Sequence, residues 1–353
     1  MNIIESWFIQ AMQFIWTYLV PHGSSTEDPF WSFTVTSLIN AAKGYFWFMI
    51  IGIVIFALFL RKGDQKMSVW AGLKHLFPAK IYTHRSFKVD MAWVPFNYVL
   101  RFTAYAALAL GAGLVQIWLV GKFGPSTLQV PAGVFAVVLQ IAFTLLGADI
   151  ARFAWHYQAH HVPFFWEFHK GHHSVEVLHP LFIRTHPVDQ VIRLFYMNVG
   201  GGAIGGGMMY LAGVNASALA ITAFVFLRAF LGSIQRFEHS HIPFSFGKRL
   251  NNIFYPPFYH PFHHSARPEH RNKNLGRPCG LIIWDKIFGT LHVPKPGEFE
   301  NIIIGSSLEE LGDNNPHRTV WRFLTNPFIE AGKILKAKKN AGSIETPETA
   351  GTL

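Results

Sequence analysis

Cysteine and charge are both scarce in this chain. A single cysteine, Cys279, occurs in 353 residues, so a disulfide framework, a cysteine-ligated iron–sulfur cluster and a thiolate zinc site cannot form within it. Charged residues make up 14% of the chain and hydrophobic residues 50%, whereas soluble domains contain about 25% charged residues. This composition argues against an ordinary soluble domain and favours a protein embedded in a membrane.

Several common ligand-binding patterns are also missing or out of place. No His-Glu-x-x-His sequence occurs, which removes the general base of the zinc proteases. No nucleic-acid-binding module is present, and the formal net charge of +10 suits a surface that faces anionic lipid. Gly200, Gly202 and Gly205 have the spacing of a dinucleotide-binding loop, but they lie inside an apolar segment without a preceding strand. We expect these glycines to serve close helix packing.

Long apolar segments predict membrane crossings, because a hydrocarbon core is about 30 Å thick. The segments are Val35–Leu60, the hairpin Phe102–Gly121 with Val130–Ala148, and the shorter pair Leu194–Leu211 with Ala216–Leu231. Ile3–Val20 is aromatic and apolar, and it fits either a further crossing or a helix lying in the interface. None of these apolar segments has the polar face, repeated at helical period, that a helix of a soluble protein would show. The sequence therefore predicts an all-α, multi-pass membrane protein.

The distribution of basic residues predicts how these segments are oriented. Residues 61–92 contain seven lysines and arginines against two aspartates, whereas residues 21–34 contain Glu27 and Asp28 and no lysine or arginine. By the positive-inside rule, residues 61–92 lie in the cytoplasm. Each later hairpin leaves the cytoplasm and returns to it. The segments that follow the two hairpins, which hold most of the histidines, are therefore expected on the cytoplasmic side.

Fourteen of the nineteen histidines crowd into residues 156–186 and 239–270. The first stretch reads His-x-x-x-His and then His-x-x-His-His, and the second reads His-x-His and then His-x-x-His-His. Spacings of three and four residues put side chains on one helix face, one turn apart, so the imidazoles can converge on a shared ion. The predicted metal ligands are His156, His160, His169, His172, His173, His239, His260, His263 and His264.

The number and type of these side chains narrow the choice of metal. Neutral imidazole suits zinc, copper, iron and nickel, while magnesium and calcium prefer oxygen ligands. One structural zinc needs four ligands, so nine histidines exceed one ion and suit two. Two redox-active ions at a membrane surface favour oxygen chemistry on a lipid. The alternatives are two zinc ions with hydrolytic chemistry, and a histidine-rich membrane protein that binds or transports metal, although transport sites lie near the bilayer midplane.

The residues around these histidines resemble those of a known family. Residues 156–160 read HYQAH, residues 166–174 read WEFHKGHHS, and residues 260–265 read HPFHHS. EHS at 238–240, NLG at 274–276 and WDKIFGT at 284–290 extend the similarity. Over residues 145–292 the chain resembles the fatty acid hydroxylase and sterol desaturase superfamily of integral-membrane di-iron proteins, and in particular its bacterial sterol-desaturase-like members.

The resemblance implies a membrane-bound non-haem di-iron oxygenase that hydroxylates or desaturates an unactivated C–H position of a lipid, such as a sterol or a fatty acyl chain. It implies two iron ions, held by the nine histidines named above, with dioxygen as co-substrate. Zinc is expected to replace iron during overexpression, because the affinity order favours it. The chain contains no flavin fold, haem-attachment motif or iron–sulfur ligand set, so an external electron-transfer protein and reductase are expected to supply electrons.

Other residues near the motifs are weaker candidates. His241 and His186 are the additional candidate ligands, and His161 points about 100° away from its neighbour on a helix. A ligating imidazole normally donates its other N–H to a carboxylate or carbonyl. Glu238 and Asp285 are the preferred carboxylates for this role, ahead of Asp149, Glu167, Glu176 and Asp189. The histidines without partners in the sequence, which we expect outside the site, are His22, His75, His84 and His317.

The predicted organisation has three parts. Residues 1–130 form an N-terminal membrane region that includes the basic connector at 61–92. Residues 131–295 form the hydroxylase-like catalytic domain, with a cytoplasmic helical cap that holds the dinuclear site. Residues 296–353 form a cytoplasmic C-terminal tail.

Overall fold

The structure is a computed structural model that describes residues 61–62, 65–181 and 183–344. The apolar segments Ile3–Val20 and Val35–Leu60 lie outside the described residues. Within the described ranges the chain is helical, apart from the two-residue strands β1 (Arg61–Lys62) and β2 (Gln65–Lys66), which pair antiparallel. The predicted all-α architecture is confirmed at this level.

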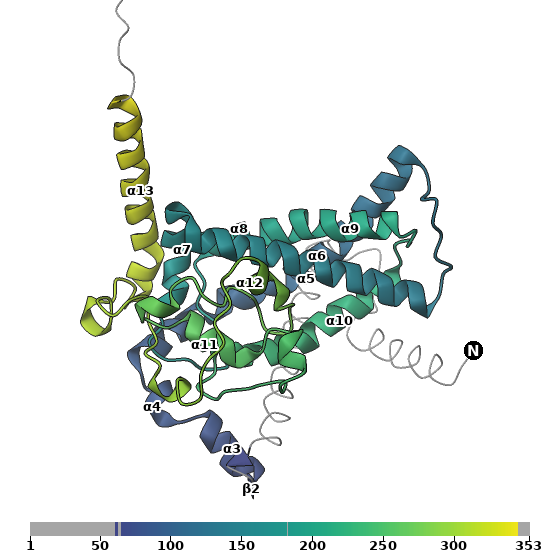
Figure 1. Ribbon diagram of the computed structural model, residues 1–353. Helices are drawn as coiled ribbons and strands as arrows, with labels where there is room; N and C mark the ends of the chain where they lie inside the picture. The colour runs from purple at the N-terminus through teal and green to yellow at the C-terminus, as the bar shows by residue number, and fades with distance from the viewer. Residues whose placement is uncertain (1–60, 63–64, 182, 345–353) are drawn as a thin grey trace, which may run out of the picture.

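The helices fall into three successive sets along the chain (Figure 1). The basic connector forms α3 (Val69–Leu76) and α4 (Ala79–Tyr82). The central set comprises α5 (Arg85–Phe123), α6 (Val134–His161), α7 (Pro163–His173), α8 (Pro187–Phe195), the π-helical segment η1 (Tyr196–Gly201), α9 (Gly202–Leu211) and α10 (Ala218–Gln235). The last set comprises α11 (His260–His263), α12 (Ile283–Ile287) and α13 (Val320–Ile344), with the short 3₁₀ turns η2 (Arg236–His239), η3 (Leu250–Asn252), η4 (Pro257–Tyr259), η5 (Pro268–His270), η6 (Phe299–Asn301) and η7 (Gly312–Asn314).

Helix α6 carries the first histidine motif because it continues past the predicted end of its apolar segment. The sequence predicted an end at Ala148, whereas the helix continues to His161. Pro163 begins α7, and Val162 before it adopts extended backbone (φ −100°, ψ 112°), as the residue preceding a proline prefers. The two helices therefore meet directly after the first histidine pair.

Within the described residues, two helices are long and apolar enough to cross a membrane, judged by length and composition, and they are Val134–His161 and Ala218–His239. Each reaches the histidine motifs at its C-terminal end. Two other predicted segments take a different form. Phe102–Gly121 is part of the 39-residue helix α5, which begins at Arg85 in the connector. Leu194–Leu211 is divided among α8, η1 and α9.

Small residues let α5, α6 and α9 approach one another closely. A side chain at Gly147 of α6 would overlap the backbone of Gly201 and Gly205, and a side chain at Gly206 of α9 would overlap the carbonyl oxygen of Ala112 in α5. Helix α9 contacts both α5 and α6. The expectation that this glycine-rich segment serves helix packing is confirmed, since close backbone approach leaves no room for a Cβ.

The segment after residue 296 packs against the histidine-bearing part of the molecule. The backbone N–H of Gly305 donates to the carbonyl oxygen of His264 at 3.0 Å. Helix α13 packs on α7, where Phe323 is fully buried and lies against Gly171. Figure 1 shows α13 beginning beside α7 and extending away from the body. Gly171 has no side chain, and Phe323 fills the space beside it. The region 296–353, predicted to be a tail, therefore begins as part of the folded unit.

Candidate metal centre

All nine histidines predicted as ligands come together in two groups of side chains. Within each group the potential ligand nitrogens lie within 4.8 Å of one another. The first, here called the five-histidine group, consists of His156, His160, His169, His173 and His263. The second, here called the four-histidine group, consists of His172, His239, His260 and His264.

The two groups adjoin because α7 contributes to both of them. His172 and His173 are neighbours on α7, and neighbouring residues on a helix point about 100° apart. His173 stacks on His264 of the other group, with ring centroids 4.4 Å apart, and the centroids of His172 and His169 are 5.2 Å apart. The two groups therefore lie side by side, and α7 and α11 (His260–His263) each contribute side chains to both.

The five-histidine group is oriented from behind by oxygen acceptors. Four of its Nδ1 atoms contact such acceptors, namely His156 with Leu275 O (2.6 Å), His160 with Asn272 Oδ1 (3.3 Å), His169 with Asp189 Oδ2 (3.2 Å) and His263 with Lys273 O (3.0 Å). An imidazole that donates from Nδ1 has its lone pair on Nε2. Nε2 of His160 and of His263 is buried and has no hydrogen-bond partner among the described residues. A bound metal ion would satisfy these atoms, so the donor set fits one.

The four-histidine group directs its nitrogens at one another. The Nε2 atom of His260 lies 3.1 Å from Nε2 of His239 and 3.1 Å from Nε2 of His264. His172 is held from behind by the carbonyl oxygen of Arg184, 2.8 Å from its Nδ1. Imidazole nitrogens converge in this way when they share a cation, and this group fits a second ion with four protein ligands.

Burial keeps these imidazoles in the form that binds metal. Burial and the neighbouring histidines lower the pKa of the site histidines on α7 and α11 well below the usual range, and burial lowers the pKa of His263 to about 3. A neutral imidazole offers a lone pair to a metal, while imidazolium does not. The site is therefore ready to bind cations at neutral pH.

Asp189, which the sequence ranked below Glu238 and Asp285, contacts a site histidine. Asp189 lies at the start of α8 and is 2% exposed, and burial raises its pKa to about 8 while Arg193 and Arg152 oppose that rise. Its oxygen contacts Nδ1 of His169 across twenty residues of sequence. The contact between Asp189 and His169 depends on the path of the loop between α7 and α8. No residue pattern in the sequence predicts that path.

The two preferred carboxylates have other positions. Asp285 accepts the backbone N–H groups of Leu275 and Gly276, both at 2.8 Å, and the Thr290 hydroxyl at 2.6 Å. Asp285 therefore fixes the segment that contains Leu275, and the Leu275 carbonyl oxygen in turn contacts His156. Asp285 acts on the imidazole indirectly, through this segment. Glu238 is buried beside the four-histidine group, and its Oε2 has no hydrogen-bond partner among the described residues.

His241 and His186 lie outside both groups. Nε2 of His241 contacts the carbonyl oxygen of His75 at 2.9 Å. His186 accepts the N–H of Val188 at the start of α8, and its other nitrogen contacts the carbonyl oxygen of Leu324 at 3.2 Å. Both imidazoles therefore stabilise contacts between segments.

Two features outside the predicted ligand set are organised in the structure. His270, His292 and Glu298 form a separate triad, in which Nε2 of each histidine lies 3.0 Å from Glu298 Oε1. His317, expected to have no partner, is 2% exposed and packs near Phe323, and burial lowers its pKa to about 3. Neither feature had a repeated spacing that sequence analysis could detect.

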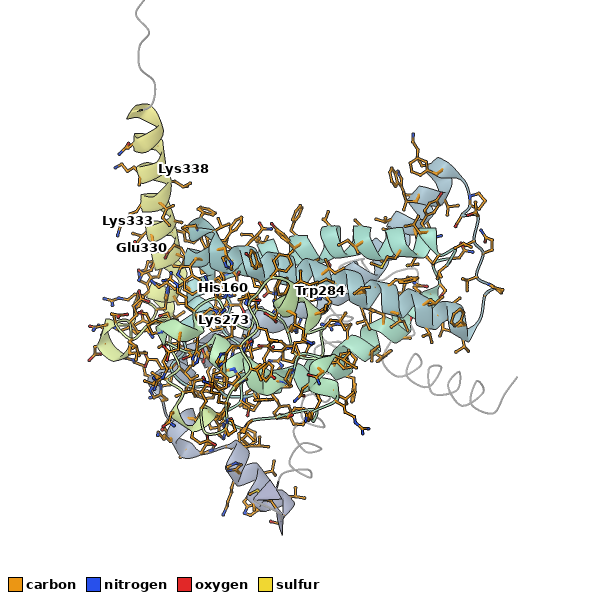
Figure 2. All side chains as sticks on the ribbon, in the orientation of Figure 1. His160, Lys273, Trp284, Glu330, Lys333 and Lys338 are labelled. Carbon is orange, nitrogen blue, oxygen red and sulfur yellow. The ribbon has the colours of Figure 1, made fainter. Side chains whose placement is uncertain are left out.

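A polar cavity of about 380 Å³ opens beside the five-histidine group. His160, His173 and His263 line it together with charged residues that include Lys170, Arg267 and Glu310. Figure 2 shows that side chains with nitrogen and oxygen gather in the half of the molecule that holds His160 and Lys273. The cavity connects the histidine site with the polar side of the fold.

Comparison with known proteins agrees with this geometry. Residues 141–290, which contain all nine histidines, match the model of the fatty acid hydroxylase family. This part of the chain is similar to fatty acid hydroxylase domains. The resemblance seen in residues 145–292 is thereby confirmed.

A curated relative belongs to a lipid-modifying enzyme class. The chain is 29% identical over 159 residues to the ornithine lipid hydroxylase OlsE of Rhizobium tropici. The match covers 45% of this chain and 43% of the relative, so it spans less than half of that protein's length. No solved structure matches the chain.

Proposed function

We propose that this protein is a membrane-bound non-haem di-iron oxygenase that hydroxylates an unactivated C–H position of a lipid. The observation that carries the proposal is the pair of adjoining histidine groups, buried within the part of the chain that is similar to fatty acid hydroxylase domains. Nine neutral imidazoles match the ligand needs of two transition-metal ions better than those of one. The nine histidines are the proposed ligands, with Asp189 and the Asp285-held segment behind them.

The reaction needs an oxidant and two electrons. Dioxygen, two electrons and two protons convert R–H to R–OH with release of water, and an external electron-transfer protein and reductase are the proposed electron source. Two bound irons would supply dioxygen activation, which no side chain provides. The nine histidines would hold the ions, and acceptors at Nδ1 orient five of them, namely His156, His160, His169, His172 and His263. All of the nine except half-buried His160 are buried, which excludes bulk water from the groups. Desaturation of the same C–H position, with loss of a second hydrogen, is the alternative outcome.

The proposed setting is the cytoplasmic surface of a membrane. The apolar helices Val134–His161 and Ala218–His239 both end in site histidines, and a membrane crossing by each would hold the site at the boundary where they emerge. The basic residues of the connector 61–92 favour the cytoplasmic side. In this scheme residues 1–130 contribute membrane anchoring, residues 131–295 contain the catalytic domain, and residues 296–353 follow it.

The test combines metal reconstitution with isotope labelling. Purified protein in lipid nanodiscs, loaded with ferrous iron and supplied with a reductase system, is incubated with ¹⁸O₂ and bacterial lipid extract. A lipid product heavier by one ¹⁸O atom supports hydroxylation, and a product lighter by two hydrogens identifies desaturation. Iron-loaded protein that yields neither product, but moves zinc or iron across sealed vesicles, would instead support the metal-transport function.

A further inference from the structure

A third group of potential metal ligands lies outside both histidine groups. It is the triad of His270, His292 and Glu298, whose potential ligand atoms all lie within 4.8 Å of one another. Nε2 of each histidine lies 3.0 Å from Glu298 Oε1, and the centroids of the two imidazole rings are 4.8 Å apart. The match to the fatty acid hydroxylase family ends at residue 290, so His292 and Glu298 lie beyond it. The triad as a whole is therefore not part of the matched region.

The triad brings together three segments of the chain and opens to solvent on one side. His270 ends η5, His292 follows α12 and the turn after it, and Glu298 directly precedes η6. His270 is 3% exposed, whereas the side chains of His292 and Glu298 are 23% and 26% exposed. The triad is therefore enclosed by protein on the side of His270 and open to water on the side of Glu298.

The ligand types and their spacing fit a zinc ion. Zinc binds imidazole nitrogen and carboxylate oxygen at about 2.0–2.2 Å, and two ligands of a tetrahedral zinc therefore lie about 3.4 Å apart. Each contact between a histidine Nε2 and Glu298 Oε1 is 3.0 Å long, so the ligand atoms need to separate only slightly to admit the ion. Three protein ligands with water in the fourth position are a known zinc arrangement, and the open side of the triad admits the water. Zinc also ranks above iron and manganese in the affinity order of divalent metals.

Burial and hydrogen bonding keep two of these ligands in the forms that bind metal at neutral pH. Burial lowers the pKa of the His292 imidazole, and the nearby Glu298 carboxylate opposes this shift without reversing it. Burial raises the pKa of Glu298, but hydrogen bonds from the Lys295 backbone N–H and from the two histidines outweigh it and lower this pKa below its usual range. A neutral imidazole and an ionised carboxylate are the forms that zinc requires.

The triad lies behind α11, the helix that contributes ligands to both histidine groups. Phe262 of α11 is fully buried, and its ring centroid lies 5.3 Å from that of His270 and 5.4 Å from that of His292. The carbonyl oxygen of His270 accepts the backbone N–H of Lys273 at 3.1 Å, and the Lys273 carbonyl oxygen contacts Nδ1 of His263 at 3.0 Å. An ion bound to the triad would therefore fix both the wall behind α11 and the turn that orients His263.

We infer that His270, His292 and Glu298 bind a zinc ion with a structural role, distinct from the two ions of the histidine groups. The zinc fastens the segment at η6 to η5 behind α11, and in this way it holds the ligands on α11 in place. The inference does not rest on the proposed hydroxylase function, because the triad would bind zinc and join these segments whatever reaction the histidine groups catalyse.

Zinc uptake by the iron-loaded protein tests the site. The full chain in uncharged detergent is loaded with ferrous iron, washed with a mild chelator that strips a three-ligand site before the larger histidine groups, and titrated with radioactive zinc without oxygen. The wild type should take up about one zinc per chain while its iron content stays unchanged. Its Tm should rise by about 4 °C at about 100 times the zinc Kd. No uptake of zinc, or uptake matched by an equal loss of iron, would overturn the site and leave the triad as a hydrogen-bonded network.

Two substitutions remove the zinc ligands without touching the histidine groups. Glu298→Gln keeps the shape of the side chain but loses its charge, and His292→Asn removes one imidazole. Each should weaken zinc binding by more than about 100-fold, because even a residue behind a ligand contributes about 10–100-fold, and iron retained at the wild-type level shows that the variant is folded. Glu300→Gln, at an exposed carboxylate two residues from Glu298, is the matched control and should bind zinc like the wild type. Wild-type zinc affinity in the two folded variants would refute the assignment.

The rate of iron release tests the structural role of the zinc. Zinc on the triad should slow the release of iron to a chelator selective for ferrous iron by about tenfold, because it stiffens the turn whose Lys273 carbonyl oxygen orients His263. Glu298→Gln should release iron at one rate with or without zinc. Zinc that binds the wild type without changing the rate of iron release would overturn the role behind α11.

Discussion

Replacement of His263 by alanine separates metal binding from ordinary folding stability. The ring of His263 is 4% exposed, its Nδ1 contacts the Lys273 carbonyl oxygen at 3.0 Å, and its Nε2 is buried without a partner among the described residues. In the metal-free protein the lost hydrogen bond is worth about 0.5–1.5 kcal/mol, while relief of the unpaired nitrogen returns about 1–3 kcal/mol. The lost hydrogen bond and the relieved nitrogen largely offset each other, so the cavity left by the buried ring determines how much the metal-free protein is destabilised.

The metal-loaded protein should respond more strongly. An ion present at 100 times its Kd stabilises the folded state by about 2.7 kcal/mol, which corresponds to about 4 °C in Tm for a chain of 353 residues. His263→Ala should therefore lower the metal content from about two ions per chain to about one. It should also reduce the gain in Tm on metal addition by about this amount, while changing the metal-free Tm much less.

Elemental analysis and thermal unfolding with and without metal measure both effects. His161→Ala is the matched control, because His161 neighbours His160 on α6 but is exposed and contacts the Tyr157 carbonyl oxygen. It should retain two ions and the full gain in Tm. One ion per chain in the reconstituted wild type would refute the dinuclear site, and two ions held with wild-type affinity by His263→Ala would exclude His263 as a ligand. A third ion would point to the triad that includes His270.

Three further results are expected. Asp189→Asn should weaken metal binding about 10–100-fold, since it removes the carboxylate behind His169, and unchanged affinity in a metal titration would contradict this role. The folded-state pKa of His317, about 3, lies below its unfolded value of about 6.5. Its contribution to stability is therefore complete above pH 6.5 and is lost as the pH falls toward 3. His317→Gln should make the loss of stability in this window shallower by about 1.4 kcal/mol per pH unit, and an unchanged slope in denaturant unfolding would argue against it. In cells whose protein has its native cysteine replaced by serine, an impermeant thiol reagent should label Thr127→Cys and not Glu309→Cys, and the opposite pattern would exclude a cytoplasmic site.

The local part of the site was predictable from sequence because it depends on helical spacing. His156 and His160 lie one turn apart on α6, and the adjacent His172 and His173 on α7 diverge into different groups. These relations follow from the geometry of a single helix. Composition likewise predicted the helical, apolar character of α6 and α10.

The partners behind the imidazoles were not predictable in the same way. Leu275 lies 119 residues from His156, and a backbone carbonyl carries no signature in the residue type. Asp90 shows the same difficulty, since it holds Arg184 through an ion pair across 94 residues, and the Arg184 carbonyl in turn orients His172. Such contacts depend on how helices cross and how loops return.

The sequence by itself therefore determined that nine imidazoles lie on a few helical faces in an apolar chain, because periodicity and composition are local properties. Only the tertiary structure decided their division into groups of five and four, the contact of Asp189 with His169, and the convergence of Arg152, Arg228 and Arg277 on one cavity. These outcomes depend on the packing of elements far apart in the chain, which local residue patterns do not specify.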